Sequence, residues 1–133
     1  MAKTNYYVSW DTHMRKSLST RDATELYHLQ SYDRKEVAGE AFGNYLLECY
    51  CDHVRSERNQ PWQALKGRKA AELIAIEKHH WLPNSVEGLN DDQLRLALHT
   101  ELHNHKLSEQ AYMACAGDLK HAGLAELAAQ HAE

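Results

Sequence analysis

The feature that most constrains the fold is a long helical repeat of apolar residues between positions 33 and 58. Side chains suited to a core recur there in adjacent pairs every four positions, a spacing that places them on one face of an α-helix. They are Val37, Ala38, Ala41, Phe42, Tyr45, Leu46, Cys49, Tyr50, His53 and Val54. Asp33 and Glu36 have the spacing of a capping box, which satisfies the first amides of a helix. The sequence therefore predicts one amphipathic helix from Asp33 to about Arg58.

Weaker signals of the same kind predict shorter helices on either side of this one. They fall at about 22–32, 61–81 and 90–107, and in two further stretches between residue 108 and residue 131. Pro61 suits the first position of a helix, and Pro83 disfavours helix at the residue before it. Asn90 and Gln93 form a second capping-box pattern. Gly117 and Gly123 are expected to end helices.

Length and composition agree with a single helical domain. The chain has 133 residues, of which 43% are hydrophobic and 26% are charged, as in ordinary globular domains. Two prolines and six glycines are too few for a β-protein built on many tight turns. We predict an all-α fold, a compact bundle of five to six helices in one domain over residues 1–133. The loosely alternating first ten residues predict a short extended segment or aromatic side chains laid on the core.

Charge and hydropathy argue against two classes of partner. The chain has 15 Lys and Arg against 19 Asp and Glu and a net charge of −4, so no chain-wide basic field attracts nucleic acid. No apolar run approaches the roughly 20 residues of a membrane helix, and the beginning of the chain lacks the apolar core of a signal peptide. Three cysteines without CxxC spacing are typical of reduced thiols. We expect a soluble protein of the cytoplasm.

Ten histidines make metal binding the first chemistry to consider, because imidazole is a frequent metal ligand. His99 and His103 stand four residues apart, on one face of the predicted helix, where they can share a metal ion. His53 and Glu57 have the same spacing. These four residues are the candidate ligands, and iron or zinc is the candidate metal.

The alternative is that the same histidines have structural roles and bind no metal. In it, His53 and His80 are half-buried packing residues on their apolar stripes, and His131 is a solvated residue near the end of the chain.

Histidine and glutamate also recur in a set order, as His28, His53-x-x-x-Glu57, His99-x-x-x-His103 and His121-x-x-x-x-Glu126. This order is similar to the ligand set of the hemerythrin family, and the resemblance implies a di-iron site in a helical bundle. Two features depart from that family. The predicted helix 61–81 separates the second pair from the third, and the last acid is glutamate where the family has aspartate.

No other catalytic pattern is present. The GxSxG, GxxxxGK[ST] and GxGxxG motifs are absent from the sequence, and each belongs to a strand–helix junction that an all-α chain lacks. Asp91 and Asp92 follow Asn90 in a first helical turn, where carboxylates stabilise the helix dipole. We therefore expect no catalysis by this chain on its own.

Aromatic residues provide the positive signal for function. Three tryptophans and seven tyrosines are more than one small helical core easily covers, and both residue types anchor protein interfaces. The candidates for exposure are Tyr6, Tyr7, Tyr27, Tyr32 and Trp62. The sequence predicts a small accessory or regulatory protein that binds a protein partner not yet identified, with a homodimer left open. The alternatives are a metal-binding helical bundle, or aromatic residues that pack internally.

Overall fold

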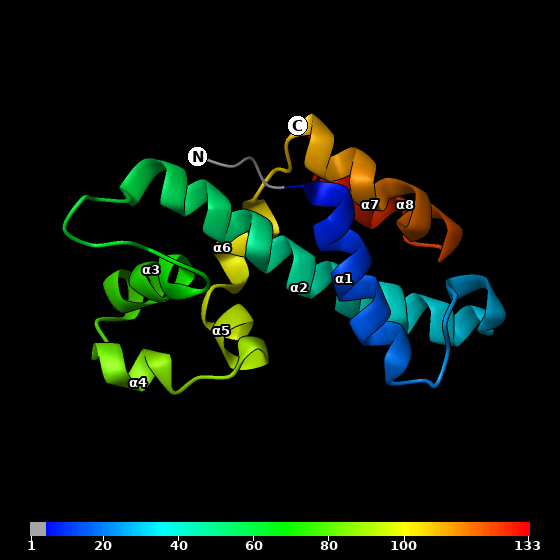
Figure 1. Ribbon diagram of the computed structural model, residues 1–133, viewed down its shortest axis with the longest axis horizontal. Coiled ribbons are helices and arrows are strands. Elements are labelled where there is room, and N and C mark those ends of the chain that lie inside the picture. Colours follow the sequence, from blue (N-terminus) through cyan, green and yellow to red (C-terminus); the bar gives the residue numbers. More distant parts are fainter. Residues whose placement is uncertain (1–4) are drawn as a thin grey trace. The chain divides into compact units, whose positions relative to one another are not determined.

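The computed structural model describes residues 5–133 and contains helices without any β-strand in that range (Figure 1). The predicted all-α fold is therefore confirmed. Five of the eight α-helices described have seven residues or more, and the rest are shorter. The helices are α1 (Tyr6–Ser19), α2 (Ser31–Arg58), α3 (Lys69–His79), α4 (Pro83–Glu87), α5 (Asp91–Ala97), α6 (His99–Asn104), α7 (Glu109–His121) and α8 (Ala125–Gln130), with a 3₁₀ turn η1 (Leu26–His28).

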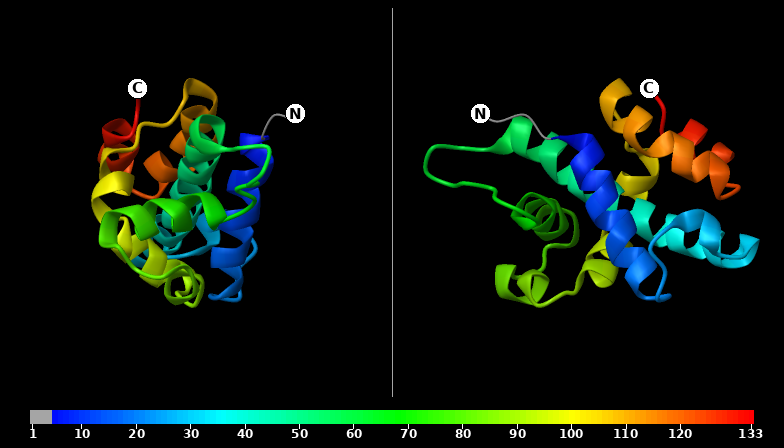
Figure 2. Two further views of the ribbon diagram at one scale, coloured as in Figure 1. Left: turned by 90° about the vertical axis from the view of Figure 1, so that its left-hand side faces the viewer. Right: turned by 45° about the vertical axis from the view of Figure 1, so that its right-hand side comes forward.

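The chain divides into two compact units, and the boundary lies within α2. Unit 1 runs to Tyr45 and resumes at Lys106, so it contains α1, η1, the first half of α2, α7 and α8. In it α7 packs against both α1 and α8. Unit 2 spans Leu46–His105, and its helix α3 packs against α4 and α5 (green to yellow in Figure 2). The single domain predicted over residues 1–133 stays a prediction.

Helix α1 replaces the extended segment expected near the start of the chain, and that expectation is wrong for the described residues from Tyr6 onward. The Asn5 side chain caps the helix by accepting a hydrogen bond from the Val8 amide at 3.2 Å. Trp10, Met14 and Leu18 then recur one turn apart and are buried. This helical spacing outweighs the weak alternation of the aromatic residues before it.

Tyr45, on α2, is the best-satisfied aromatic residue of unit 1. Its side chain is fully buried, and its hydroxyl donates a 2.6 Å hydrogen bond to the Ala111 carbonyl on α7. The Trp10 ring meets the Tyr45 ring edge-on, with centroids 5.3 Å apart. Trp10 Nε1 in turn donates to an Asp118 carboxylate oxygen at 2.8 Å. Both polar tips are therefore paired, as buried tyrosine and tryptophan require.

The connection between α1 and α2 differs from the sequence prediction. The helix expected at 22–32 reduces to the turn η1, and α2 begins at Ser31. Asp33 is then the third helical residue, so the predicted Asp33–Glu36 capping box is wrong. The Glu36 carboxylate instead accepts a hydrogen bond from Arg21 at 2.5 Å. A partner 15 residues away on the chain gives no local signal.

In unit 2, α2 ends at Arg58 as predicted, but Pro61 does not begin a helix. Residues 59–68 form a loop, and α3 starts only at Lys69. Near the end of α3 the chain turns at His80, whose φ of 58° lies in the left-handed region. Pro83 then opens the short α4 at its first turn, where proline is favoured.

The other helix-end predictions had mixed outcomes. The Asn90–Gln93 capping box is confirmed, with both reciprocal hydrogen bonds present. The helix predicted over 90–107 is interrupted at Leu98, which separates α5 from α6. Gly123 follows α7 with a φ of +82°, as a helix-ending glycine should. Gly117 lies inside α7, so its predicted role was wrong.

None of the helices in residues 5–133 is long and apolar enough to cross a membrane.

The buried hydroxyl of Tyr45 can be tested by Tyr45→Phe. We expect this change to lower the free energy of unfolding by about 1–3 kcal/mol, because the Ala111 carbonyl loses its buried donor. Urea unfolding measures the difference. Tyr7→Phe, at an exposed site on α1, is the control and should change stability by less than about 0.5 kcal/mol. Equal effects of the two changes would contradict the role assigned to the hydroxyl.

Candidate functional site

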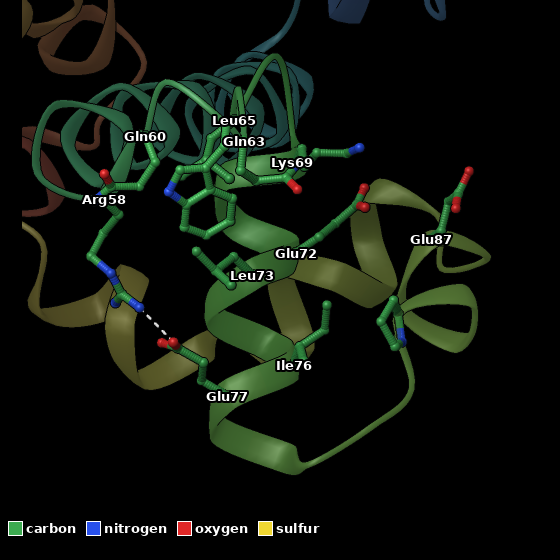
Figure 3. Close-up of a pocket in the computed structure, with 12 residues that line it drawn as sticks. Arg58, Gln60, Gln63, Leu65, Lys69, Glu72, Leu73, Ile76, Glu77 and Glu87 are labelled. Carbon is green, nitrogen blue, oxygen red and sulfur yellow. Dashed lines mark hydrogen bonds and ion pairs between the residues drawn. The ribbon is translucent and has the colours of Figure 1, made fainter.

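Unit 2 contains an open groove of about 550 Å³ between the loop after α2, the outer face of α3 and the start of α4 (Figure 3). We call it the Trp62 groove. Its apolar lining comes from Trp62, Leu65, Leu73, Ile76 and Pro83. Its volume lies within the range of pockets that bind ligands or anchor side chains. All of the lining residues belong to unit 2.

The loop that presents Trp62 is fixed by hydrogen bonds from the end of α2. The Arg55 guanidinium donates to the carbonyls of Leu65 at 2.6 Å and Gly67 at 2.8 Å. The Asn59 side chain accepts a hydrogen bond from the Leu65 amide at 2.8 Å. Gly67 has a φ of +57°, which favours glycine there. The path of the loop is thus set by side chains of the preceding helix.

Trp62 itself sits at the tip of a closed turn. The amides of Gln60 and Gln63 donate to each other's carbonyls at 3.3 and 3.0 Å. The Trp62 side chain is 80% exposed, which is unusual for the largest apolar side chain. The main chain is held while the indole faces solvent, as the sequence predicted for this residue.

The floor of the groove is the outward face of α3. Ala70, Ala71 and Ala75 form the buried face of this helix. Leu73 and Ile76, one turn apart, lie on the other side and are only half-buried. The small alanines permit close packing of α3 on unit 2, and the larger side chains are left to line the groove.

Charged groups of both signs border the groove. Arg58 donates to the Glu77 carboxylate at 2.5 Å, and the hydrogen bond and charge of Glu77 raise the pKa of Arg58. In Figure 3 this pair lies to the left of Leu73 and Ile76, while Lys69 and Glu87 lie to the right.

Arg68 anchors the segment where α3 begins. It donates to Glu72 at 2.7 Å, to Asp91 at 2.8 Å and to the Leu89 carbonyl at 2.6 Å. It therefore ties the start of α3 to α5 and to the turn before α5. Glu72, a lining residue, is already held by this contact.

The four candidate metal ligands form two separate pairs. His53 Nε2 lies 3.4 Å from Glu57 Oε1, and both side chains are more than half exposed. The rings of His99 and His103 lie parallel with centroids 6.3 Å apart. In the described part of the chain, no three His, Cys, Asp or Glu side chains gather in a way that could hold a metal ion. The structure therefore brings together each pair but not the four.

The ligand order that resembles the hemerythrin family is divided between the two units. His28, His121 and Glu126 belong to unit 1, and both pairs named above belong to unit 2.

Several histidines have roles that the sequence did not show. His131 is buried, with 3% exposure, and packs against Phe42, so its predicted solvation is wrong. His53 and His80 are exposed rather than half-buried. The His79 ring contacts the Ala97 carbonyl at 2.7 Å and stacks on Trp81 with centroids 4.3 Å apart.

Of the five aromatic residues predicted to be exposed, four are exposed and one is half-buried. Tyr7, Tyr27, Tyr32 and Trp62 are exposed, and Tyr6 is half-buried. Trp81 is also partly exposed, at 43%, and its ring stacks on that of His79.

The cysteines are not reactive groups of a site. Cys49, Cys51 and Cys115 are buried, and none forms a disulfide. Burial raises the pKa of Cys51 to about 11 and that of Cys115 to about 12. Both thiols are neutral at pH 7, and the thiol form is a poor nucleophile.

A second hollow, in unit 1, is a weaker candidate for a binding site than the Trp62 groove. It has a volume of about 660 Å³ and lies between α1, the residues around η1, and α7. Its apolar floor is Met14, Leu18 and Leu26. At its edge Asp11 and Arg15 already pair with each other at 2.7 Å.

Comparison of the chain with models of known protein families, with curated proteins and with solved structures finds no match.

The buried thiols predict a fall in stability at alkaline pH. Their ordinary pKa is 9.0, so unfolded chains lose these protons above pH 9 while native chains keep them up to about 11 and 12. The unfolded state then binds fewer protons, and the free energy of unfolding decreases as pH rises. We expect a loss on the order of 2 kcal/mol between pH 8 and pH 10, measured by urea unfolding.

The matched control replaces both thiols, as Cys51→Ala with Cys115→Ala. This variant starts less stable but should lose less between the two pH values. In the unsubstituted protein at pH 7, a thiol reagent should label these cysteines only after unfolding. Rapid labelling of the folded protein would show that the thiols are accessible and would refute the prediction.

Proposed function

We propose that this chain is a small accessory or regulatory protein that acts by binding another protein, without catalysis of its own, and that the Trp62 groove is its binding surface. The observation that carries the proposal is the 80% exposed indole of Trp62 beside an apolar hollow. Tryptophan is among the residues most enriched at the energetic centres of protein interfaces.

The construction of the groove supports this proposal. The hydrogen bond that Arg55 donates to the Leu65 carbonyl and the one that Asn59 accepts from the Leu65 amide fix the loop before any partner arrives. A surface that is already ordered loses less conformational entropy on binding. An apolar centre with charged edges is also the usual composition of a protein interface.

The charges around the groove support a protein partner over a nucleic acid. The lining has two cations, Arg58 and Lys69, against the three acids Glu72, Glu77 and Glu87. Phosphate backbones need a surplus of cations on the surface that meets them.

Metal binding stays the alternative proposal, with His99, His103, His53 and Glu57 as ligands and iron or zinc as the metal. Each pair supplies two protein ligands, whereas zinc sites take three or four. The described residues alone therefore do not fit a complete site, and we derive no chemistry from one.

The alternative makes its own prediction. If it holds, protein purified without a tag and without added metal contains near-stoichiometric iron or zinc, and His103→Ala removes the metal. Elemental analysis measures this, with His80→Asn as the control that should retain the metal, because His80 is exposed and lies outside both candidate ligand sets. Metal-free, folded protein would eliminate this function.

The binding proposal is tested by the Trp62→Ala variant. We expect the unsubstituted chain to capture at least one protein from cells that naturally produce it, and Trp62→Ala to lose that protein. Quantitative mass spectrometry of affinity-isolated samples measures the difference. Tyr32→Ala removes a similarly exposed aromatic side chain of unit 1 and should keep the same protein. Identical captures by all three chains would reject the groove as the binding surface.

A further inference from the structure

We infer that, when no other partner is bound, the Trp62 groove binds the same groove on a second copy of this chain and forms a twofold homodimer. The inference rests on the proposed function, because it uses the same protein-binding surface. The inference goes further by naming a second copy of this chain as a molecule that binds there.

The first argument is that the groove contains both a projection and a hollow. In a twofold dimer the same patch meets itself, so the patch must be complementary to itself. The Trp62 side chain is 80% exposed and stands next to the hollow lined by Leu73, Ile76 and Pro83. With the twofold axis near the centre of the groove, each indole enters the hollow of the other copy.

The second argument is the distribution of charge. One side of Leu73 and Ile76 carries Arg58 and Glu77, and the other side carries Lys69 and Glu87 (Figure 3). A half-turn places one mixed pair opposite the other mixed pair. Edges of a single sign would repel their own copy, whereas each of these edges carries one cation and one acid, so the groove can face a second copy without a net repulsion between the edges.

The third argument is that the surface needs little rearrangement. The Gln60–Gln63 turn and the contacts of Arg55 hold the loop in place. All residues involved lie in unit 2. Interfaces between ordered surfaces of this kind form with small changes in the main chain.

The first experiment measures the mass of the purified full chain by light scattering and sedimentation from about 1 to about 100 μM. We expect a dimer that dissociates on dilution. Trp62→Ala should raise the dissociation constant about thirtyfold or more, as for central interface residues. Ile76→Lys, at the floor, should do the same, and Tyr32→Ala should leave the constant unchanged. Circular dichroism and thermal unfolding check that each variant is folded.

The second experiment locates the interface. Since the three native cysteines are buried, Gln63→Cys introduces a thiol at the groove that is open to reagents. Under mild oxidation, or with a short bis-maleimide, we expect this variant to form covalent dimers. Gln110→Cys, at an exposed position on α7 of unit 1, is the matched control and should stay monomeric under denaturing electrophoresis.

A chain that is monomeric over the whole concentration range overturns the inference. A dimer that neither Trp62→Ala nor Ile76→Lys weakens also overturns it, as does cross-linking through Gln110→Cys but not Gln63→Cys. These outcomes are distinct from failure of the proposed function. A monomeric chain that captures a partner through Trp62 keeps that function and rejects the dimer, and a dimer broken by Trp62→Ala in a chain that captures no partner supports the dimer alone.

Discussion

The buried stripe of α2 is the constraint on which the rest of the structure depends. The other helices have between 5 and 14 residues, and isolated helices of that length are marginal in water. They are stable only because they pack on a larger apolar surface. In unit 1 that surface meets α1 through Trp10 and α7 through the hydroxyl of Tyr45. In unit 2 the later turns of the same helix carry the buried Cys51 and Val54.

The end of α2 also determines the candidate binding surface. The Arg55 guanidinium donates hydrogen bonds to two carbonyls of the following loop and to the Asp52 carboxylate. A lysine would not reproduce this set of directed hydrogen bonds. Because these contacts satisfy the loop without involving Trp62, the indole is left available to a partner. Arg68 fixes the start of α3 in a similar way, by donating hydrogen bonds from its guanidinium to Glu72 and Asp91.

Elements specified by neighbouring residues were predictable, and elements specified by distant contacts were not. The period of the α2 stripe and the Asn90–Gln93 capping box are local, and both are confirmed, apart from His53, which is exposed. The loop 59–68 depends on Arg55 reaching a carbonyl ten residues away, while Pro61 suits a turn as well as a helix start. For the site, the exposure of Trp62 was foreseen but the groove was not. Leu73 and Ile76 have core-like spacing, and only the burial of Ala70, Ala71 and Ala75 shows that α3 presents its smaller face inward.

Several polar groups that could take part in chemistry are instead committed to the fold. Arg55 and Arg68 hold main-chain carbonyls, His79 contacts the Ala97 carbonyl, and His131 is buried against Phe42. The two thiols with raised pKa values are neutral at pH 7. Recognition needs less than catalysis from such a chain, because a fixed apolar projection beside a hollow already distinguishes one surface from another. The Trp62 groove has both features on one loop–helix junction, and both binding proposals depend on them.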